Sequence, residues 1–103
     1  MGKSLIDIAK EVIQTESDSV LLLKDRIDQN FIDVCHTLKS CMGKVVLIGM
    51  GKSGHIAKKI SSTFASTGTP SFYIHPAEAC HGDLGMISHD DCILALSYSG
   101  ETQ

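Results

Sequence analysis

The spacing of apolar and polar positions changes near residue 43. Before that point apolar residues recur every three or four positions, which is typical of amphipathic helices. Ser4 to Asp7 has the form of a helix start, and the polar residues 16–19 predict a break before a long second helix that ends at Met42 and Gly43. The apolar face of the long helix packs either on its own domain or also on a second subunit, and the pattern leaves both open.

After residue 43, short apolar runs surround one further helical pattern. Residues 44–48 predict a strand covered on both faces, 53–66 a helix, and 71–75 and 93–97 two more strands. The segment 77–88 is harder to assign and fits a helical turn followed by a loop. A strand–helix–strand order implies parallel pairing with a right-handed crossover. We therefore expect an α/β fold.

The same pattern suggests how the chain is divided. We expect residues 1–42 to form a helical segment and residues 43–103 to form the first part of a parallel-sheet domain. Three strands with an open last edge make a poor domain by themselves. We therefore expect this chain to be the front part of a longer protein.

Composition and charge narrow the class of protein. The chain has 103 residues, of which 43% are hydrophobic and 20% charged, so it is globular. The net charge of −3 and the scattered lysines give no reason to expect nucleic acid or a membrane as partner. No apolar run approaches the roughly 20 residues that cross a bilayer. The four cysteines form no Cys-x-x-Cys pair, so we expect reduced thiols, no metal site and a cytoplasmic location.

A glycine-rich loop, Gly49-Met-Gly-Lys-Ser-Gly54, joins the first predicted strand to the helix. Backbone N–H groups at such a helix start favour an anion, usually a phosphate. Ser53 either binds that anion or caps the helix, and Lys52 is either a cation for a phosphate or developing oxyanion or a solvated lysine. The loop fits the dinucleotide fingerprint, but the second strand ends in His75-Pro76 where an acid would bind the ribose. A P-loop also fits poorly, because Val46 stands at its first glycine.

Polar segments follow the other two strands. Ser97-Tyr-Ser-Gly-Glu-Thr102 places three hydroxyls around one glycine, which suits either a phosphate-binding nest or a helix cap. Titratable side chains cluster between the strands, and they suit proton transfer or structural hydrogen bonds: His75, Glu78, His81 and Asp83. We consider His81 the strongest of them. Since the carboxyl ends of parallel strands share one edge of a sheet, the loops predict a phosphorylated ligand there.

Together these blocks closely resemble the sugar isomerase (SIS) domain of bacterial D-arabinose 5-phosphate isomerases. The resemblance covers about residues 43–103. It rests on five blocks: Gly49-Met-Gly-Lys-Ser-Gly-His55, Thr63-Phe-Ala-Ser-Thr-Gly-Thr-Pro70, His75-Pro76 with Glu78, His81-Gly-Asp-Leu-Gly85, and Ser97-x-Ser-Gly-Glu-Thr102. The last block marks the wider superfamily, whereas the first and fourth together are much more specific to these isomerases.

The resemblance implies a fold and an activity. The fold is a three-layer, flavodoxin-like or Rossmann-like arrangement with a five-stranded parallel sheet between helices, usually followed by a tandem CBS pair in a tetramer. The activity is aldose–ketose isomerisation between D-ribulose 5-phosphate and D-arabinose 5-phosphate through an enediol, without a cofactor. The product supplies the lipopolysaccharide sugar Kdo, and other members serve capsule or sugar-alcohol metabolism.

The resemblance also implies site residues. Lys52 would stabilise charge, and His81 would open the sugar ring or shuttle a proton. The residues expected to bind the substrate and its phosphate are Gly51, Ser53, His75, Ser97, Ser99, Gly100 and Thr102. In the family, a further glutamate and a later histidine come after the stretch that this chain spans. We therefore expect the 103-residue piece to be inactive by itself.

A second hypothesis is a non-catalytic SIS module that senses a phosphosugar or nucleotide sugar. A regulator of that kind carries an effector domain such as a helix-turn-helix, and none is visible before residue 43. The presence of both Lys52 and His81 also favours the enzyme.

Overall fold

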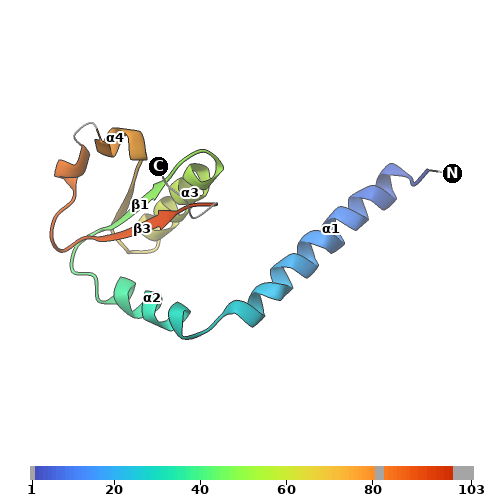
Figure 1. The fold of residues 1–103 in the computed structure, drawn as a ribbon, viewed down its shortest axis with the longest axis horizontal. Helices are drawn as coiled ribbons and strands as arrows, with labels where there is room; N and C mark the ends of the chain where they lie inside the picture. Colours follow the sequence, from blue (N-terminus) through green and yellow to red (C-terminus); the bar gives the residue numbers. More distant parts are fainter. Residues whose placement is uncertain (1, 81–82, 99–103) are drawn as a thin grey trace. The chain divides into compact units, whose positions relative to one another are not determined.

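The computed structural model of the chain describes residues 2–80 and 83–98. The chain forms two compact units, residues 1–35 and residues 36–103. The first unit is helical. Its elements are α1 (Leu5–Leu22), the 3-10 turn η1 (Leu23–Arg26) and the beginning of α2 (Gln29–Lys39) (Figure 1).

The expected break at residues 16–19 is wrong, because α1 runs through it. The polar side chains there bond within the helix: Gln14 Nε2 donates to Asp18 Oδ1 (2.8 Å), and the Ser19 hydroxyl donates to the Thr15 carbonyl (2.8 Å). The break comes instead at Ile27, whose backbone is extended at φ −77° and ψ 116°. The long helix predicted from residue 20 to residue 41 is therefore divided, and α2 ends at Lys39, two residues early.

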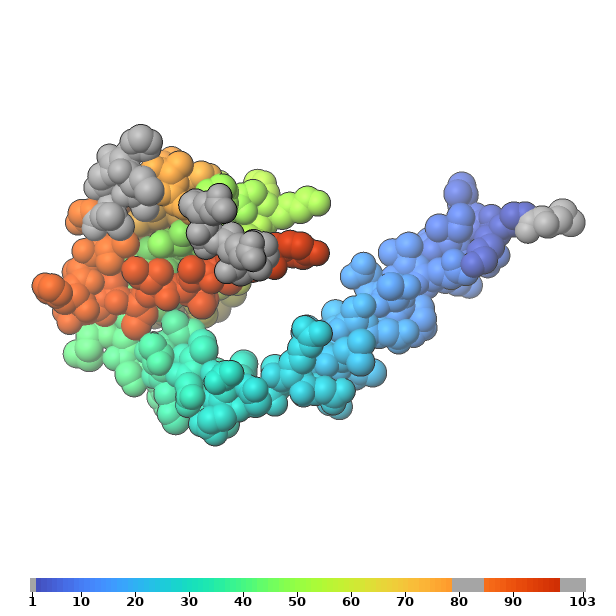
Figure 2. Space-filling view, in the orientation of Figure 1, coloured from blue at the N-terminus to red at the C-terminus, as the bar shows by residue number. Residues whose placement is uncertain are grey.

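No described residue of the first unit is buried. All of α1 is exposed, including Leu5 (85%) and Ile13 (67%) (blue in Figure 2). Its start is confirmed, since Ser4 is the N-cap and its hydroxyl accepts a hydrogen bond from the Asp7 amide at 3.0 Å. Among the described helices, none is both long and apolar enough to span a membrane.

The second unit contains a three-stranded parallel sheet. Its elements are β1 (Val45–Gly49), α3 (Lys52–Ser66), β2 (Ser71–Ile74), α4 (Pro76–Cys80), η2 (Asp83–Met86) and β3 (Cys92–Leu96). The strand order is β2-β1-β3, with Val45 opposite Ser71 on one side and Cys92 on the other. This agrees with the predicted strand–helix–strand unit, and each predicted strand is displaced by at most one residue.

The core forms around the central strand. Val45, Val46 and Leu47 are at most 1% exposed, because β1 has a neighbouring strand on each side and α3 packs against the sheet. Val45 and Leu47 meet Ala57 of α3 in one cluster. Burial of a side chain such as Leu47 contributes about 1.5–3 kcal/mol. This packing fixes where β1 ends and α3 begins, and so positions the loop between them.

A carboxylate joins the loop before β3 to the start of β1. Asp91 Oδ1 accepts a hydrogen bond from the Lys44 amide (2.7 Å), and Oδ2 accepts one from the Ser88 amide (2.9 Å). These backbone hydrogen bonds, that of Ser88 first, hold the pKa of Asp91 below its ordinary value of 3.8. The contact closes the amino end of the sheet, opposite the edge that carries the glycine-rich loop.

Candidate functional site

The order in which the chain adds strands to the sheet reverses at β1. The chain continues to β2 on one side of β1 and to β3 on the other, so the carboxyl ends of β1 and β3 flank a topological switch point. In open parallel sheets, ligands bind in the crevice outside the carboxyl ends of the strands at such a point. A cavity of about 590 Å³ lies there, lined by Met50, Lys52, Ser53, Ile56 and Tyr98. The first four follow β1, and Tyr98 comes two residues after the end of β3.

The loop between β1 and α3 leaves the start of the helix open. Gly51 is the N-cap of α3 and has φ 62° and ψ −130°, a conformation that side-chain-bearing residues rarely adopt. Gly51 has no side chain with which to cap this end of the helix. The amides of the first turn are therefore available to an anion, and the helix dipole adds to the attraction.

Two other glycines let the strand and helix approach each other closely. A Cβ on Gly54 would lie 2.8 Å from the Gly49 carbonyl oxygen and 2.9 Å from the Tyr73 hydroxyl. A Cβ on Gly49 would lie 2.7 Å from the Ser53 carbonyl oxygen. The glycines of the predicted loop thus serve the turn and the packing as well as the approach of a ligand.

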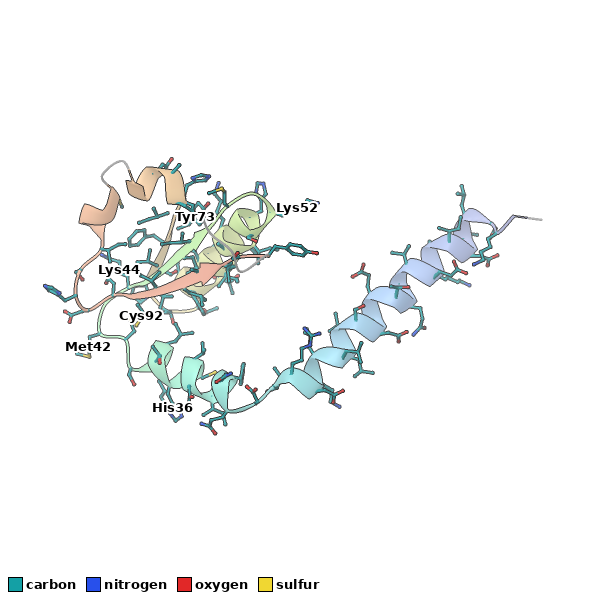
Figure 3. The ribbon with its side chains drawn as sticks, in the orientation of Figure 1. His36, Met42, Lys44, Lys52, Tyr73 and Cys92 are labelled. Carbon is teal, nitrogen blue, oxygen red and sulfur yellow. The ribbon has the colours of Figure 1, made fainter. Side chains whose placement is uncertain are left out.

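Tyr73 of β2 stabilises the glycine-rich loop through a contact with its first residue. Its hydroxyl donates a hydrogen bond to the Gly49 carbonyl, where β1 ends. The Lys58 ammonium lies 5.2 Å from the centroid of its ring. Figure 3 shows Tyr73 within the second unit and Lys52 at the start of α3. Tyr73 therefore ties the second strand to the loop that borders the cavity.

The cavity combines a charged group with an apolar rim. Lys52 is exposed and Ser53 half-buried, both in the first turn of α3. Ile56, one turn further on, is 57% exposed and Met50 is 54% exposed. A ligand at this site would meet a cation, a hydroxyl, open amides and apolar surface.

His75 follows β2 at the same edge of the sheet but has a local role. Its Nδ1 accepts a hydrogen bond from the Ala77 amide at 3.0 Å, which caps the short helix α4. An accepting Nδ1 leaves the proton of the neutral ring on Nε2. His75 does not line the cavity of Lys52 and Ser53, so its expected part in substrate binding stays a prediction.

The remaining expected residues divide into two groups. Ser97 is exposed and directly follows β3, so it lies at the same edge of the sheet as the glycine-rich loop. Four lie outside the described residues: His81, Ser99, Gly100 and Thr102. Within the described ranges, no group of three or more histidine, cysteine and acidic side chains is placed to hold a metal ion.

Comparison with known protein families assigns the chain to a domain family. The family model of the SIS domain matches residues 38–103. The chain belongs to the SIS domain family. The match begins inside α2, so the sheet, the glycine-rich loop and the cavity all lie within it.

Two curated relatives of this SIS domain chain carry the same name, arabinose 5-phosphate isomerase KdsD. The protein of Pseudomonas aeruginosa is 56% identical over 97 residues, which cover 94% of this chain and 30% of that protein. The protein of Escherichia coli K12 is 54% identical over 93 residues, which cover 90% of this chain and 28% of that protein. The chain therefore spans about 30% of the length of the curated relatives it matches.

Two solved structures share the fold of this SIS domain chain. A protein of Escherichia coli CFT073, solved in complex with arabinose 5-phosphate, superposes with a TM-score of 0.90 at 48% identity and covers 99% of this chain and 55% of that chain. A phosphosugar isomerase of Bacteroides fragilis, described as involved in capsule formation, gives a TM-score of 0.87 at 37% identity, with 91% of this chain and 50% of that chain covered. The expected SIS fold is thus confirmed for its N-terminal portion.

Sequence reasoning missed four residues near the SIS domain cavity. Three complete its lining (Met50, Ile56 and Tyr98), and Tyr73 supports the loop. Ile56 could have been found, because it stands four positions after Lys52 and so shares its helix face. Tyr98 stands between Ser97 and Ser99, both of which are expected to bind phosphate, and the pattern gave it no separate role. Nothing in the sequence indicated the hydrogen bond of Tyr73.

Proposed function

We propose that the chain is part of an aldose–ketose isomerase that interconverts D-ribulose 5-phosphate and D-arabinose 5-phosphate. The observation that carries the proposal is the cavity at the switch point, where Lys52 and Ser53 meet the segment after β3. The names of the relatives support it, since two are arabinose 5-phosphate isomerases and one solved neighbour holds arabinose 5-phosphate.

The phosphate of the substrate would bind at the start of α3. Gly51 leaves the first amides of the helix open, and Ser53 adds a hydroxyl beside them. Ser97 follows the neighbouring strand and would add a second hydroxyl from the other side of the crevice. By the family resemblance, Ser99, Gly100 and Thr102 would complete the phosphate site.

Lys52 would supply positive charge to the reaction. Isomerisation moves a proton between C1 and C2 of the open-chain sugar, and the intermediate enediol carries negative charge on oxygen. A cation placed at that oxygen stabilises the transition state more than the ground state. Lys52 is free to reach into the cavity, because its side chain is exposed there.

His81 would open the ring or carry the proton, a role assigned by resemblance alone. An imidazole titrates near neutral pH and so can both accept and donate a proton during one turnover. We further propose that the reaction needs no cofactor and serves the pathway to Kdo and lipopolysaccharide or a related sugar pathway. The whole protein would be a cytoplasmic homo-oligomer.

The binding part of the proposal is tested on the chain itself. Thermal shift or calorimetry with arabinose 5-phosphate, with arabinose and with NAD separates the classes of ligand. We expect a shift with the sugar phosphate and none with the other two. A shift with NAD alone would overturn both the isomerase and the phosphosugar sensor.

The catalytic part is tested on the product of the full reading frame that encodes this chain. Conversion of ribulose 5-phosphate to arabinose 5-phosphate is measured for the parent protein and for Lys52→Ala and His81→Ala. Loss of one electrostatic contact to a transition state costs about 100- to 1,000-fold in kcat. Lys59→Ala is the matched control, since Lys59 is an exposed lysine of α3 that does not line the cavity. An inactive parent protein that still binds the sugar phosphate would establish the sensor instead.

A further inference from the structure

Two cysteines meet at the amino end of the sheet, away from the cavity. Cys41 follows α2, and Cys92 is the first residue of β3. The Cys41 thiol donates to the carbonyl oxygens of Asp90 (3.4 Å) and Lys44 (3.5 Å). The same Lys44 oxygen accepts the backbone amide of Cys92 at 2.9 Å. The two residues therefore share one hydrogen-bonded junction, although they lie far apart in the sequence.

The side chain of Cys92 turns back toward the helix that precedes Cys41. Its sulfur lies 3.8 Å from the carbonyl oxygen of Thr37, one helical turn before Cys41. Figure 3 shows Cys92 where β3 begins, near the end of α2. A hydrogen bond with Cys41 is the largest cause that raises the pKa of the Cys92 thiol, followed by partial burial. Both thiols are free and half-buried.

We propose that Cys41 and Cys92 form a dithiol site that closes to an intrachain disulfide when a disulfide oxidant reaches it. With glutathione disulfide, the thiolate of one cysteine attacks a glutathione sulfur and releases one glutathione. The thiolate of the second cysteine then attacks the protein sulfur of the mixed disulfide and releases the other glutathione. The two protein thiols lose two hydrogens in total, and one glutathione disulfide is reduced to two glutathiones.

The bond would enclose most of the folded unit. The closed loop runs from residue 41 to residue 92 and contains β1, α3 and β2, and with them the glycine-rich loop. A cross-link over a long loop stabilises mainly by restricting the unfolded chain. Because the junction lies at the amino ends of the strands, the disulfide leaves the cavity at their carboxyl ends open. The proposal is independent of the isomerase activity.

The experiment is oxidation of the native 103-residue chain with glutathione disulfide, followed by intact mass and peptide mapping. We expect a 41–92 cross-link, shown by the loss of two hydrogens from the peptides of Cys41 and Cys92. In a Cys35→Ser, Cys80→Ala background the whole chain shows that loss with no added glutathione. Its melting temperature rises by on the order of 10 °C and returns after reduction.

Cys92→Val in the same background is the control, because valine keeps the position apolar and has no thiol. It should gain one glutathione at Cys41 and show no rise in melting temperature. Separate glutathione adducts on Cys41 and Cys92 would overturn the proposal. So would two thiols that stay reduced while the exposed Cys35 of the unmutated chain reacts.

Discussion

The two longer helices begin in opposite ways. The start of α1 is closed by its own sequence, since the hydroxyl of Ser4 accepts the Asp7 amide. The start of α3 is left open, because its N-cap is Gly51, which has no side chain to bond to the first turn. A capping side chain satisfies the helix and leaves nothing for a ligand, whereas an uncapped first turn beside a cavity keeps its amides for an anion. The difference supports the proposal that the start of α3 binds the ligand.

The largest expected effect comes from substituting the open cap. Gly51→Ala forces a side chain into φ 62° and should lower the free energy of unfolding by about 1–3 kcal/mol. It should also weaken binding of arabinose 5-phosphate by about tenfold or more, because the first amides of α3 shift. Denaturant unfolding and calorimetry measure the two effects.

Gly68→Ala is the matched control for that substitution. Gly68 has φ 100°, and a Cβ there meets nothing within 4 Å, so the backbone strain is similar but lies after α3. It should destabilise the chain and leave ligand affinity unchanged. Equal losses of affinity in both variants would mean that stability, and not the open helix start, controls binding.

A smaller effect on stability is expected from removing the hydrogen bond between Tyr73 and the glycine-rich loop. Tyr73→Phe removes the hydroxyl that bonds to the Gly49 carbonyl and should lower the free energy of unfolding by about 1 kcal/mol. Tyr98→Phe is the control, because the Tyr98 side chain is fully exposed and its hydroxyl should carry little stability. Chemical denaturation measures the free energy of unfolding of both variants. A Tyr73 variant as stable as the Tyr98 variant would mean that the hydrogen bond to Gly49 does not stabilise the loop.

Substitution of Ser4, the N-cap of α1, should reduce the helix content without changing ligand affinity. Ser4→Ala removes the acceptor of the Asp7 amide and should cost α1 about 0.5–1 kcal/mol. Far-ultraviolet circular dichroism should show a partial loss of helix, while calorimetry shows the same affinity for the sugar phosphate. A clear loss of affinity would remove the contrast between the two helix starts.

The smallest expected effect is on the pH dependence of stability, through the Asp91 carboxylate at the amino end of the sheet. Hydrogen bonds from the backbone of Ser88 and Lys44 lower the pKa of Asp91, so its stabilising contribution is present above the ordinary pKa and is lost as pH falls through the folded value. The unfolding free energy should therefore fall more steeply between about pH 5 and pH 3 in the parent chain than in Asp91→Asn. Parallel pH profiles would show that Asp91 does not contribute.

The strands and α3 were predictable because their signals are local. Continuous apolar runs, a helical spacing and glycines at the junction placed β1, α3, β2 and β3 within about one residue. The division between α1 and α2 was not predictable in this way. Serine and aspartate at residues 16–19 favour helix starts, but here their side chains bond along the helix, and the break falls at Ile27 and Asp28.

The glycine-rich loop that borders the cavity could be predicted from the sequence, but the rest of the cavity lining could not. A glycine-rich loop between a buried strand and a helix favours an anion at the helix start, so Lys52 and Ser53 could be proposed from the sequence. The rim formed by Met50, Ile56 and Tyr98 depends on how far β3 is staggered against β1, which only the register shows. The expected part of His75 in substrate binding stays a prediction, and the structure adds that its Nδ1 caps α4, a role that depends on the turn that follows.

The central position of β1 also bears on how the chain folds. Its contacts with α3 and β2 join residues within the continuous segment 45–74, whereas β3 must be brought from residue 92. Local contacts form before distant ones because less chain has to be ordered to make them. The β1–α3–β2 segment is therefore the expected folding nucleus, where substitutions slow folding, and β3 is the strand that docks last, where substitutions speed unfolding.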